Sequence, residues 1–459
     1  MSTTVLETSA ISPPPGSAAD LTLPLCFFDI IWLHFHPIRR LIFYNHPCTE
    51  AEFSSTVVPN LKHSLSLTLQ HFPPVAGNLL FPVDTDKSRP FLRYVSGDTA
   101  PLTIAVSGRD FDELVAGSHA RDSDQFYEFL PLMPPIAEEE NYKIAPLIAL
   151  QATLFPGRGI CIGVSNHHCL GDARSIVGFV WAWAETNRNN GDERLRNRSP
   201  LLIYDRSLVF GDTQKADEKY WSVMRNIRLT SSSFPVPRGR VRAAFTLHHS
   251  DIKKLKNKVL SKNPDLVFVS SFAVTAAYTW SSVVKSARAA GEEVDDDRDE
   301  VFFFPADARG RPNAMVDPPV PVNYFGNCLG GGMIKMEHKK VAAEEGFVAA
   351  AEAIADQINN VVNNKENFLK GADNWLSEMP KFGELSTFGV SGSPKFDLLN
   401  SDFGWGTGSR LEVLSMDKEK YSMSLCNSSD SPGGLVVGLS LPKERMDAFA
   451  TIFDDGLKF

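Results

Sequence analysis

The chain has 459 residues, of which 43% are hydrophobic and 22% are charged, a composition typical of a soluble globular protein with more than one hydrophobic core. The formal net charge of −9 argues against a nucleic-acid-binding surface, and no apolar run reaches the roughly 18 residues of a membrane span. The six cysteines form no C-x-x-C pair and the N-terminus lacks a secretory pattern, so we expect reduced thiols and a cytoplasmic protein.

The elements predicted first along the chain are an extended arm and a long helix. Residues 8–20 are rich in Ser, Pro, Ala and Gly, which favours an extended arm. The apolar segment from Leu23 to Tyr44 is predicted to be buried. Apolar residues that recur four apart predict a helix from Glu50 to Phe72, in which Pro59 allows a kink or an early break.

A hairpin and a second helix are predicted next. Leu147–Leu154 and Ile160–Val164 have β-rich compositions, and the segment between them contains Pro and Gly, which is typical of a hairpin turn. Apolar residues at helical spacing then predict a helix over Ala173–Glu185. The residues between this hairpin and this helix therefore form a strand-to-helix turn.

The second half of the chain is predicted to begin after a polar surface crossover, Asn187–Pro200. Capping residues and hydrophobic spacing predict helices and one strand beyond it. They are a helix capped by Ser250 or Asp251 and running to Leu260, helices over Ser270–Lys285 and Val341–Val362, a strand over Gly434–Leu441 and a helix over Pro442–Phe453.

The strand-to-helix turn holds the most informative segment, in which His167 and His168 precede Asp172. Histidine is the side chain best suited to accept a proton near neutral pH, so one interpretation is a general base. A metal site is a second, although adjacent histidines on a strand point to opposite faces and rarely share one ion. The third is one buried and one exposed histidine beside a turn aspartate, and spacing alone leaves all three open.

The other motifs say less about the type of reaction. The chain has no G-x-S-x-G, no G-x-G-x-x-G and no P-loop, so a serine hydrolase and common nucleotide sites have no signal. The turn Asp402–Gly406, with the sequence DFGWG, has a composition that favours packing. Arg309 and Arg311 follow the apolar run Val301–Phe304, and arginines there often pair with carboxylates or phosphates, a solvated loop being the alternative.

Taken together, these motifs resemble those of the plant BAHD acyltransferases, a coenzyme-A-dependent family. The His-His-x-x-x-Asp motif occurs at His167–Asp172 and DFGWG at Asp402–Gly406. Tyr324–Cys328, with the sequence YFGNC, is similar to a motif of the anthocyanin and flavonoid glycoside branch, and His167–Ala173 to its malonyl-transferring members. The resemblance extends over nearly the whole chain.

The resemblance implies a chloramphenicol acetyltransferase-like α/β fold. Two similar-sized mixed-sheet domains would enclose a central solvent channel, with the acyl-CoA entering from one side and the acceptor from the other. Residues 1–190 would form the N-terminal acyltransferase domain, 191–220 a crossover loop and 221–459 the C-terminal domain.

The resemblance also implies roles for residues at the centre of the channel. His168 would be the general base, while Asp172 would point away from the acceptor, pair with Arg309 and hold the turn. Ser391 or Ser393 lies in the family segment near the tetrahedral oxyanion. The DFGWG residues would be structural, namely Asp402, Gly404, Trp405 and Gly406.

Contacts to the donor are implied in the same way. The candidates for binding coenzyme A are Ser270, Ser271, Phe272, Lys395 and Arg410. Relatives often have Lys-Pro-Lys-Lys after DFGWG, whereas this chain has Thr407–Arg410, so two positive charges are missing and Arg410 is a partial substitute. Arg174 is the candidate for the carboxylate of the acyl group, a solvated arginine at a helix start being the alternative.

The predicted function is transfer of malonyl from malonyl-CoA to a sugar hydroxyl, the 6-hydroxyl, of an anthocyanin or flavonoid glucoside. The nearest alternative is a hydroxycinnamoyl donor such as coumaroyl-CoA. A non-catalytic glycoside-binding relative and a metal-dependent hydrolase are alternatives of other classes. We expect acyl-CoA as co-substrate, no permanently bound cofactor or metal, no nucleic-acid or membrane partner, and a monomer.

Overall fold

The computed structural model describes residues 2–117, 119–192, 201–209, 214–227, 229, 239–310, 319–376, 386–418 and 421–458. Its first sheet consists mainly of strands from the N-terminal half. The order is β1 (Thr3–Ile11), β6 (Ala100–Ser107), β10 (Ile148–Phe155), β11 (Gly159–Asn166), β3 (Ile38–Tyr44) and β16 (Arg410–Val413). β6 and β10 run parallel and the other neighbours run antiparallel. β10 and β11 are buried along their whole length, which explains their nearly continuous apolar sequences.

The second sheet consists mainly of strands from the C-terminal half. The order is β14 (Leu329–Glu337), β13 (Asp299–Asp307), β15 (Ser386–Ser391), β17 (Tyr421–Asn427), β18 (Leu435–Pro442), β12 (Arg240–Leu247) and β7 (Arg121–Asp122). β15 is parallel to both of its neighbours and the remaining pairs are antiparallel. The mixed α/β fold predicted from the sequence is therefore confirmed.

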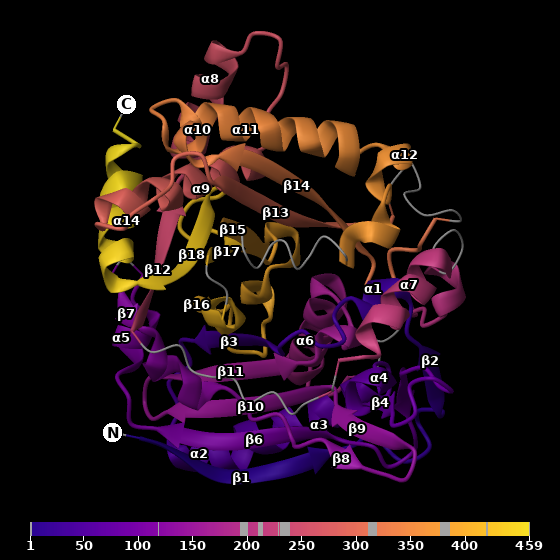
Figure 1. Ribbon diagram of the computed structural model, residues 1–459. Coiled ribbons are helices and arrows are strands. Elements are labelled where there is room, and N and C mark those ends of the chain that lie inside the picture. The colour runs from indigo at the N-terminus through magenta and orange to yellow at the C-terminus, as the bar shows by residue number, and fades with distance from the viewer. Residues whose placement is uncertain are drawn as a thin grey trace.

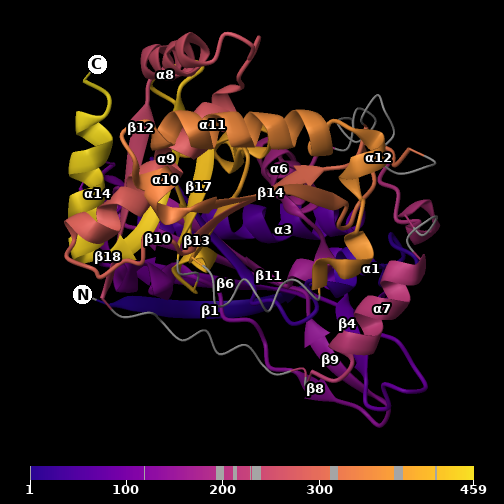
Figure 2. The same ribbon diagram turned by 45° about the horizontal axis from the view of Figure 1, so that its top comes forward.

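A third sheet and the helices complete the fold. The third sheet is antiparallel, in the order β2 (Leu21–Pro24), β5 (Phe91–Tyr94), β4 (Asn78–Pro82), β9 (Tyr142–Pro146) and β8 (Ala137–Glu138). Figure 1 and Figure 2 both show α11 lying over β14. The α-helices are α1 (Phe27–Ile30), α2 (Glu50–Glu52), α3 (Val58–Leu69), α4 (Pro73–Ala76), α5 (Phe111–Val115), α6 (Ala173–Arg188), α7 (Gln214–Met224), α8 (His249–Lys262), α9 (Ser271–Ala289), α10 (His338–Ala342), α11 (Gly346–Gln357), α12 (Lys365–Phe368) and α14 (Lys443–Asp455).

Two strands exchange between the halves of the chain. β16 comes late in the sequence but pairs with β3, whereas β7 comes early but pairs with β12. In Figure 1 the N-terminal half, indigo to magenta, lies below the orange and yellow C-terminal half, and β16 lies next to β3. The division into 1–190, 191–220 and 221–459 stays a prediction. The predicted crossover Asn187–Pro200 lies partly outside the described residues, because 193–200 are among those not described.

Most predicted elements are confirmed. The hairpin is β10 and β11, with Phe155 paired to Gly159, and the helix after it is α6. The predicted helix over Glu50–Phe72 is helical from Glu50 to Leu69, with a π-helical segment over Phe53–Val57 directly before α3. Pro59 has no N–H to donate to the preceding turn, which accounts for the irregularity at this point.

Three details of the sequence prediction are wrong. Residues 8–11 belong to β1 rather than to an extended arm. The N-cap of α8 is His248 rather than Ser250 or Asp251, and Asp251 accepts a hydrogen bond from the His248 N–H instead. The helix expected over Val341–Val362 is divided into α10, α11 and the π-helical segment Ile358–Val362.

Candidate active site

The turn between β11 and α6 carries the two histidines and the aspartate. His167 precedes a 3₁₀ segment, His168–Leu170, and its Nδ1 accepts a hydrogen bond from the Cys169 N–H at 3.2 Å. Asp172 is the N-cap of α6, where its Oδ1 accepts from the Ser175 N–H at 3.3 Å. A Cβ on Gly171 would lie 2.7 Å from the Ser175 Cβ, so the turn requires glycine at this position.

Asp172 forms a buried ion pair with Arg309. The Arg309 Nη1 lies 2.8 Å from Asp172 Oδ2, and both side chains are almost completely buried. The same carboxylate oxygen accepts from the Cys328 N–H at 3.0 Å. Burial alone would lower the pKa of Arg309, but the neighbouring Asp172 carboxylate raises it above its usual value. The predicted pairing of these two residues is thus present, and Asp172 binds Arg309 and backbone N–H groups in this geometry.

The YFGNC segment holds this turn from the other half of the chain. Arg309 donates to the Tyr324 carbonyl at 3.0 Å and to the Gly326 carbonyl at 2.6 Å. The Asn327 side chain donates to the His168 carbonyl and to Asp29 Oδ1, both at 2.9 Å. Asn327 therefore connects the backbone of His168 to the fully buried Asp29. In the sequence this segment is recognisable only as a family motif, and no local pattern indicates its bonds to the histidine turn.

The ring of His168 is held between aromatic side chains. It stacks on Trp32, with ring centroids 4.0 Å apart and planes 11° apart, and contacts the edge of Phe35 at 5.8 Å. Burial lowers the pKa of His168 to about 4, and the positive charge of Arg40 contributes in the same direction. The imidazole is therefore neutral at physiological pH, which is the form that accepts a proton.

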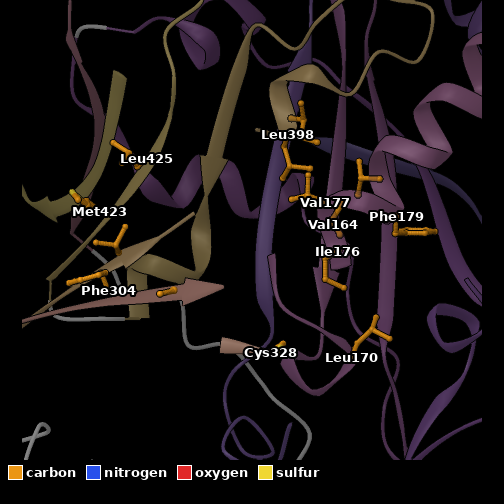
Figure 3. Packing of buried hydrophobic residues seen from close by; sticks show 14 of the residues in the cluster. Val164, Leu170, Ile176, Val177, Phe179, Phe304, Cys328, Leu398, Met423 and Leu425 are labelled. Carbon is orange, nitrogen blue, oxygen red and sulfur yellow. The ribbon is translucent and has the colours of Figure 1, made fainter. Parts of the chain in front are cut away.

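His168 borders a cavity of about 320 Å³ between the first and second sheets. Ser391 and Ser393, the predicted oxyanion candidates, line the same cavity. Most of the other lining residues are apolar, including Trp32, Phe303 and Phe396. Figure 3 shows buried residues from both halves of the chain in this region. Val177 and Leu398 lie close together on the right of the view, and Met423 and Leu425 lie on the left.

The remaining donor candidates lie elsewhere. Ser270 caps α9 by accepting from the Ala273 N–H, and Ser271 is the first residue of that helix. Phe272 packs on Phe304 at 5.3 Å. Because Phe304 alternates with the cavity-lining Phe303 along β13, the ring of Phe272 packs on the face of β13 opposite to the cavity. Their predicted contact with coenzyme A stays a prediction.

The charged candidates differ in how far they are already paired. Lys395 is exposed in the turn after Ser393. Arg410 donates to Glu412 Oε1 at 2.9 Å, so it is already bound to a carboxylate, which it shares with Arg121 and Arg242. Arg174 donates to Asp307 Oδ2 at 2.7 Å and lies over the ring of Phe396 at 5.0 Å. Contacts of any of the three with the donor stay predictions.

The DFGWG residues form a packed turn. Asp402 Oδ1 accepts from the N–H groups of Gly404 and Gly406, at 2.8 and 2.9 Å. Phe403 stacks on Trp405 and contacts the edge of Trp183 on α6. These contacts match the packing interpretation, and none of the motif residues is among those that line the cavity.

The described residues also bear on metal binding, membrane-spanning helices and disulfides. Among them, no group of three His, Cys, Asp or Glu side chains is placed to hold a metal ion. None of the described helices combines the length and apolar composition of a bilayer span. All six cysteines are free and five are buried, in agreement with the thiols expected from the sequence.

The fold is that of the two-domain acyltransferases related to chloramphenicol acetyltransferase, with a histidine on a cavity between two sheets. The solved structure of vinorine synthase is similar, with a TM-score of 0.67 and 18% identity over 97% of this chain and 96% of that one. A family model described as the Transferase family matches residues 1–455. The chain therefore belongs to this family, the BAHD acyltransferases, and is an enzyme that transfers acyl groups.

Two curated relatives are similar over almost their whole length. The chain is 55% identical over 455 residues to the malonyl-coenzyme:anthocyanin 5-O-glucoside-6'''-O-malonyltransferase of Salvia splendens, which covers 98% of this chain and 95% of the relative. It is 41% identical to phenolic glucoside malonyltransferase 1 of Nicotiana tabacum, with 99% of both chains covered.

Proposed function

We propose that this enzyme transfers malonyl from malonyl-CoA to a sugar hydroxyl, the 6-hydroxyl, of an anthocyanin or flavonoid glucoside. The observation that carries the choice of substrates is the 55% identity to the Salvia splendens malonyltransferase over nearly the whole chain. The geometry supports the type of reaction, because a neutral histidine borders a cavity of about 320 Å³. Malonyl-CoA is then a co-substrate rather than a resident cofactor.

The proposed chemistry is a proton transfer coupled to acyl transfer. His168 accepts the proton of the sugar hydroxyl, and the oxygen attacks the thioester carbon. The C–O bond forms as the carbonyl becomes a tetrahedral oxyanion, for which the hydroxyl groups of Ser391 or Ser393 are the candidate donors. The intermediate collapses, the C–S bond breaks, and the thiolate leaves as free coenzyme A with the proton that His168 returns.

A second candidate is transfer of a hydroxycinnamoyl group, such as coumaroyl. The observation that favours it is the aromatic lining of the cavity, which includes Trp32, Phe35, Phe303 and Phe396. The same rings also suit the flavonoid part of the acceptor. The aromatic lining is therefore weaker evidence for a hydroxycinnamoyl donor than the similarity to malonyltransferases is for malonyl. The cytoplasmic location and the monomeric state also stay predictions.

The test is a comparison of donors. The purified protein is incubated with one anthocyanin 5-glucoside and, separately, with malonyl-CoA, coumaroyl-CoA or acetyl-CoA, and the products are weighed by mass spectrometry. We expect a malonyl ester from malonyl-CoA at the highest kcat/KM. A higher kcat/KM with coumaroyl-CoA would replace the proposed donor, and no transfer from any of the three donors to this glucoside would overturn the proposal. Unchanged activity in excess chelator is expected, which distinguishes this reaction from metal-dependent hydrolysis.

A further inference from the structure

Arg40 is the one residue bearing a formal charge at neutral pH among those that line the cavity within the described part of the chain. It lies on β3, opposite Val164 of β11 and Val413 of β16. Val413 and Leu411 of β16 line the cavity beside it. The guanidinium is therefore in a mostly apolar space between the two sheets.

The charge of Arg40 has little compensation from the protein. Its Nη1 donates one long hydrogen bond, 3.3 Å, to Asn166 Oδ1, and among the described residues no carboxylate lies within ion-pairing distance of it. Burial lowers the pKa of Arg40 to about 10, which still leaves it protonated at neutral pH. A charged group in apolar surroundings is unfavourable unless it is paired, so the cavity favours an anionic ligand.

The neighbouring arginines are different. Arg174 is paired with Asp307 at 2.7 Å, and Arg309 is paired with both Asp172 and Asp307. Neither Arg174 nor Arg309 is among the lining residues. Arg40, which no sequence motif indicates, is thus the cavity-lining cation among the described residues with capacity for a bidentate bond to a ligand carboxylate.

Arg40 also lies close to the reacting centre. Its hydrogen-bond partner Asn166 comes two residues before His168, and its charge acts on the imidazole. In a malonyl thioester one methylene group separates the free carboxylate from the carbonyl that is attacked. A carboxylate receptor for this acyl group must therefore be near the base, as Arg40 is.

We propose that Arg40 binds the free carboxylate of the acyl group and forms the subsite that selects a carboxylated donor over a neutral one. This inference rests on the proposed function, since it concerns the donor of the same reaction. A coumaroyl or acetyl group would leave the Arg40 charge unpaired, so the subsite discriminates against neutral donors as well as favouring malonyl.

The experiment compares malonyl-CoA, acetyl-CoA and free coenzyme A in wild type, Arg40→Gln, Arg40→Lys and Arg174→Gln, with Arg288→Gln on the exposed end of α9 as the matched control. We expect Arg40→Gln to lower kcat/KM for malonyl-CoA by about 100-fold and that for acetyl-CoA by less than about 3-fold. Arg40→Lys should recover part of the malonyl activity, and Arg288→Gln should match the wild type.

Calorimetric binding to the turnover-blocked His168→Ala chain gives a second readout. We expect malonyl-CoA to bind more tightly than acetyl-CoA, and we expect the added Arg40→Gln change to remove that difference while leaving the affinity for free coenzyme A unchanged. Circular dichroism and the thermal midpoint report whether each variant is folded.

Several results would overturn the inference. An equal loss of kcat/KM with both donors would mean that Arg40 acts on the reacting carbonyl, and a loss of affinity for free coenzyme A would mean that it contacts the phosphates or the pantetheine. Loss of the malonyl preference in Arg174→Gln but not in Arg40→Gln would assign the carboxylate to Arg174. If the wild type transfers no malonyl at all, the proposed function fails, while the binding comparison still decides the role of Arg40.

Discussion

The residue on which the proposed mechanism depends is His168. As the proposed general base, His168 would contribute about 10²- to 10⁴-fold to the rate, so we expect His168→Ala to lose at least that much in kcat and to bind malonyl-CoA nearly as well as the wild type. Because its pKa is about 4, we also expect the wild-type kcat/KM to stay level near neutral pH and to fall as the pH drops through about 4.

His167 is the internal control for that prediction. Its Nδ1 accepts a backbone hydrogen bond and it is not among the cavity-lining residues, so His167→Gln should keep most of the turnover. Stopped assays over pH 4 to 8 measure the turnover of each variant, and its stability is measured at the same pH values. The comparison distinguishes loss of the base from unfolding. If His168→Ala is active and His167→Gln is inactive, the base is His167 and not His168.

At this scale the sequence predicted a part of the site. Motif spacing placed His168 and Asp172 together on one turn, and the family resemblance added Arg309, which lies 137 positions further along the chain and is found 2.8 Å from Asp172. Trp32, Arg40 and Asn327 were not predicted as site residues. Their positions depend on how β3 pairs with β11 and on where the YFGNC segment lies, and no local pattern encodes either.

At the scale of elements, the turn before α6 and the YFGNC segment behave as one unit. Asp172 joins them through Arg309 and the Cys328 N–H. We expect Asp172→Asn to lower the free energy of unfolding by about 3 kcal/mol, because loss of one partner from a buried ion pair leaves the other charge undercompensated. Asp307 also binds Arg309, so the loss of stability should be at the low end of the range for broken buried ion pairs. Since the turn carries His168, kcat should fall as well.

Asp402→Asn is the matched control for this prediction. Asp402 also accepts from two backbone N–H groups, but in the DFGWG turn and not beside the cavity. Urea unfolding and the kcat of the folded fraction should show a stability loss in both variants and a fall in kcat only in Asp172→Asn. A normal kcat in Asp172→Asn would mean that the ion pair does not position His168.

Elements with a strong local pattern were predicted best. Hydrophobic spacing predicted α6 and α9 to within a few residues. The single helix expected over Val341–Val362 failed because the chain turns between α10 and α11, where a Cβ on Gly346 would lie 2.1 Å from the Val341 carbonyl oxygen. Apolar residues on both sides of that turn pack on the same core, so their spacing mimics one helix.

At the scale of the whole molecule, a buried ionic cluster joins the two sheets that enclose the cavity. Glu412 lies on β16 in the first sheet, and its carboxylate binds Arg121 of β7 at 2.7 Å and Arg242 of β12 at 2.9 Å in the second. Its partners are 291 and 170 positions away in sequence, so sequence patterns could not have indicated this cluster. Burial alone would raise the pKa of Glu412, but the surrounding arginines hold it well below its usual value.

The last prediction follows from this cluster. The folded-state pKa of Glu412 is lowered, so its contribution to stability is present above its usual pKa near 4.5 and is lost as the pH falls below that value. Glu412→Gln removes the charge at every pH and leaves Arg121 and Arg242 undercompensated. We expect it to lower the free energy of unfolding at pH 7 by about 3–5 kcal/mol.

Urea unfolding at pH 7 and at pH 4 measures this contribution directly. The difference between wild type and Glu412→Gln should be smaller at pH 4, where the wild-type chain begins to lose the same contribution. The exposed pair of Lys443 and Asp447 on α14 provides the control, since Asp447→Asn should change stability by less than about 1 kcal/mol. Equal effects of the two substitutions would show that the cluster adds nothing to the joining of the sheets, and the cavity geometry would then depend on apolar packing and strand exchange alone.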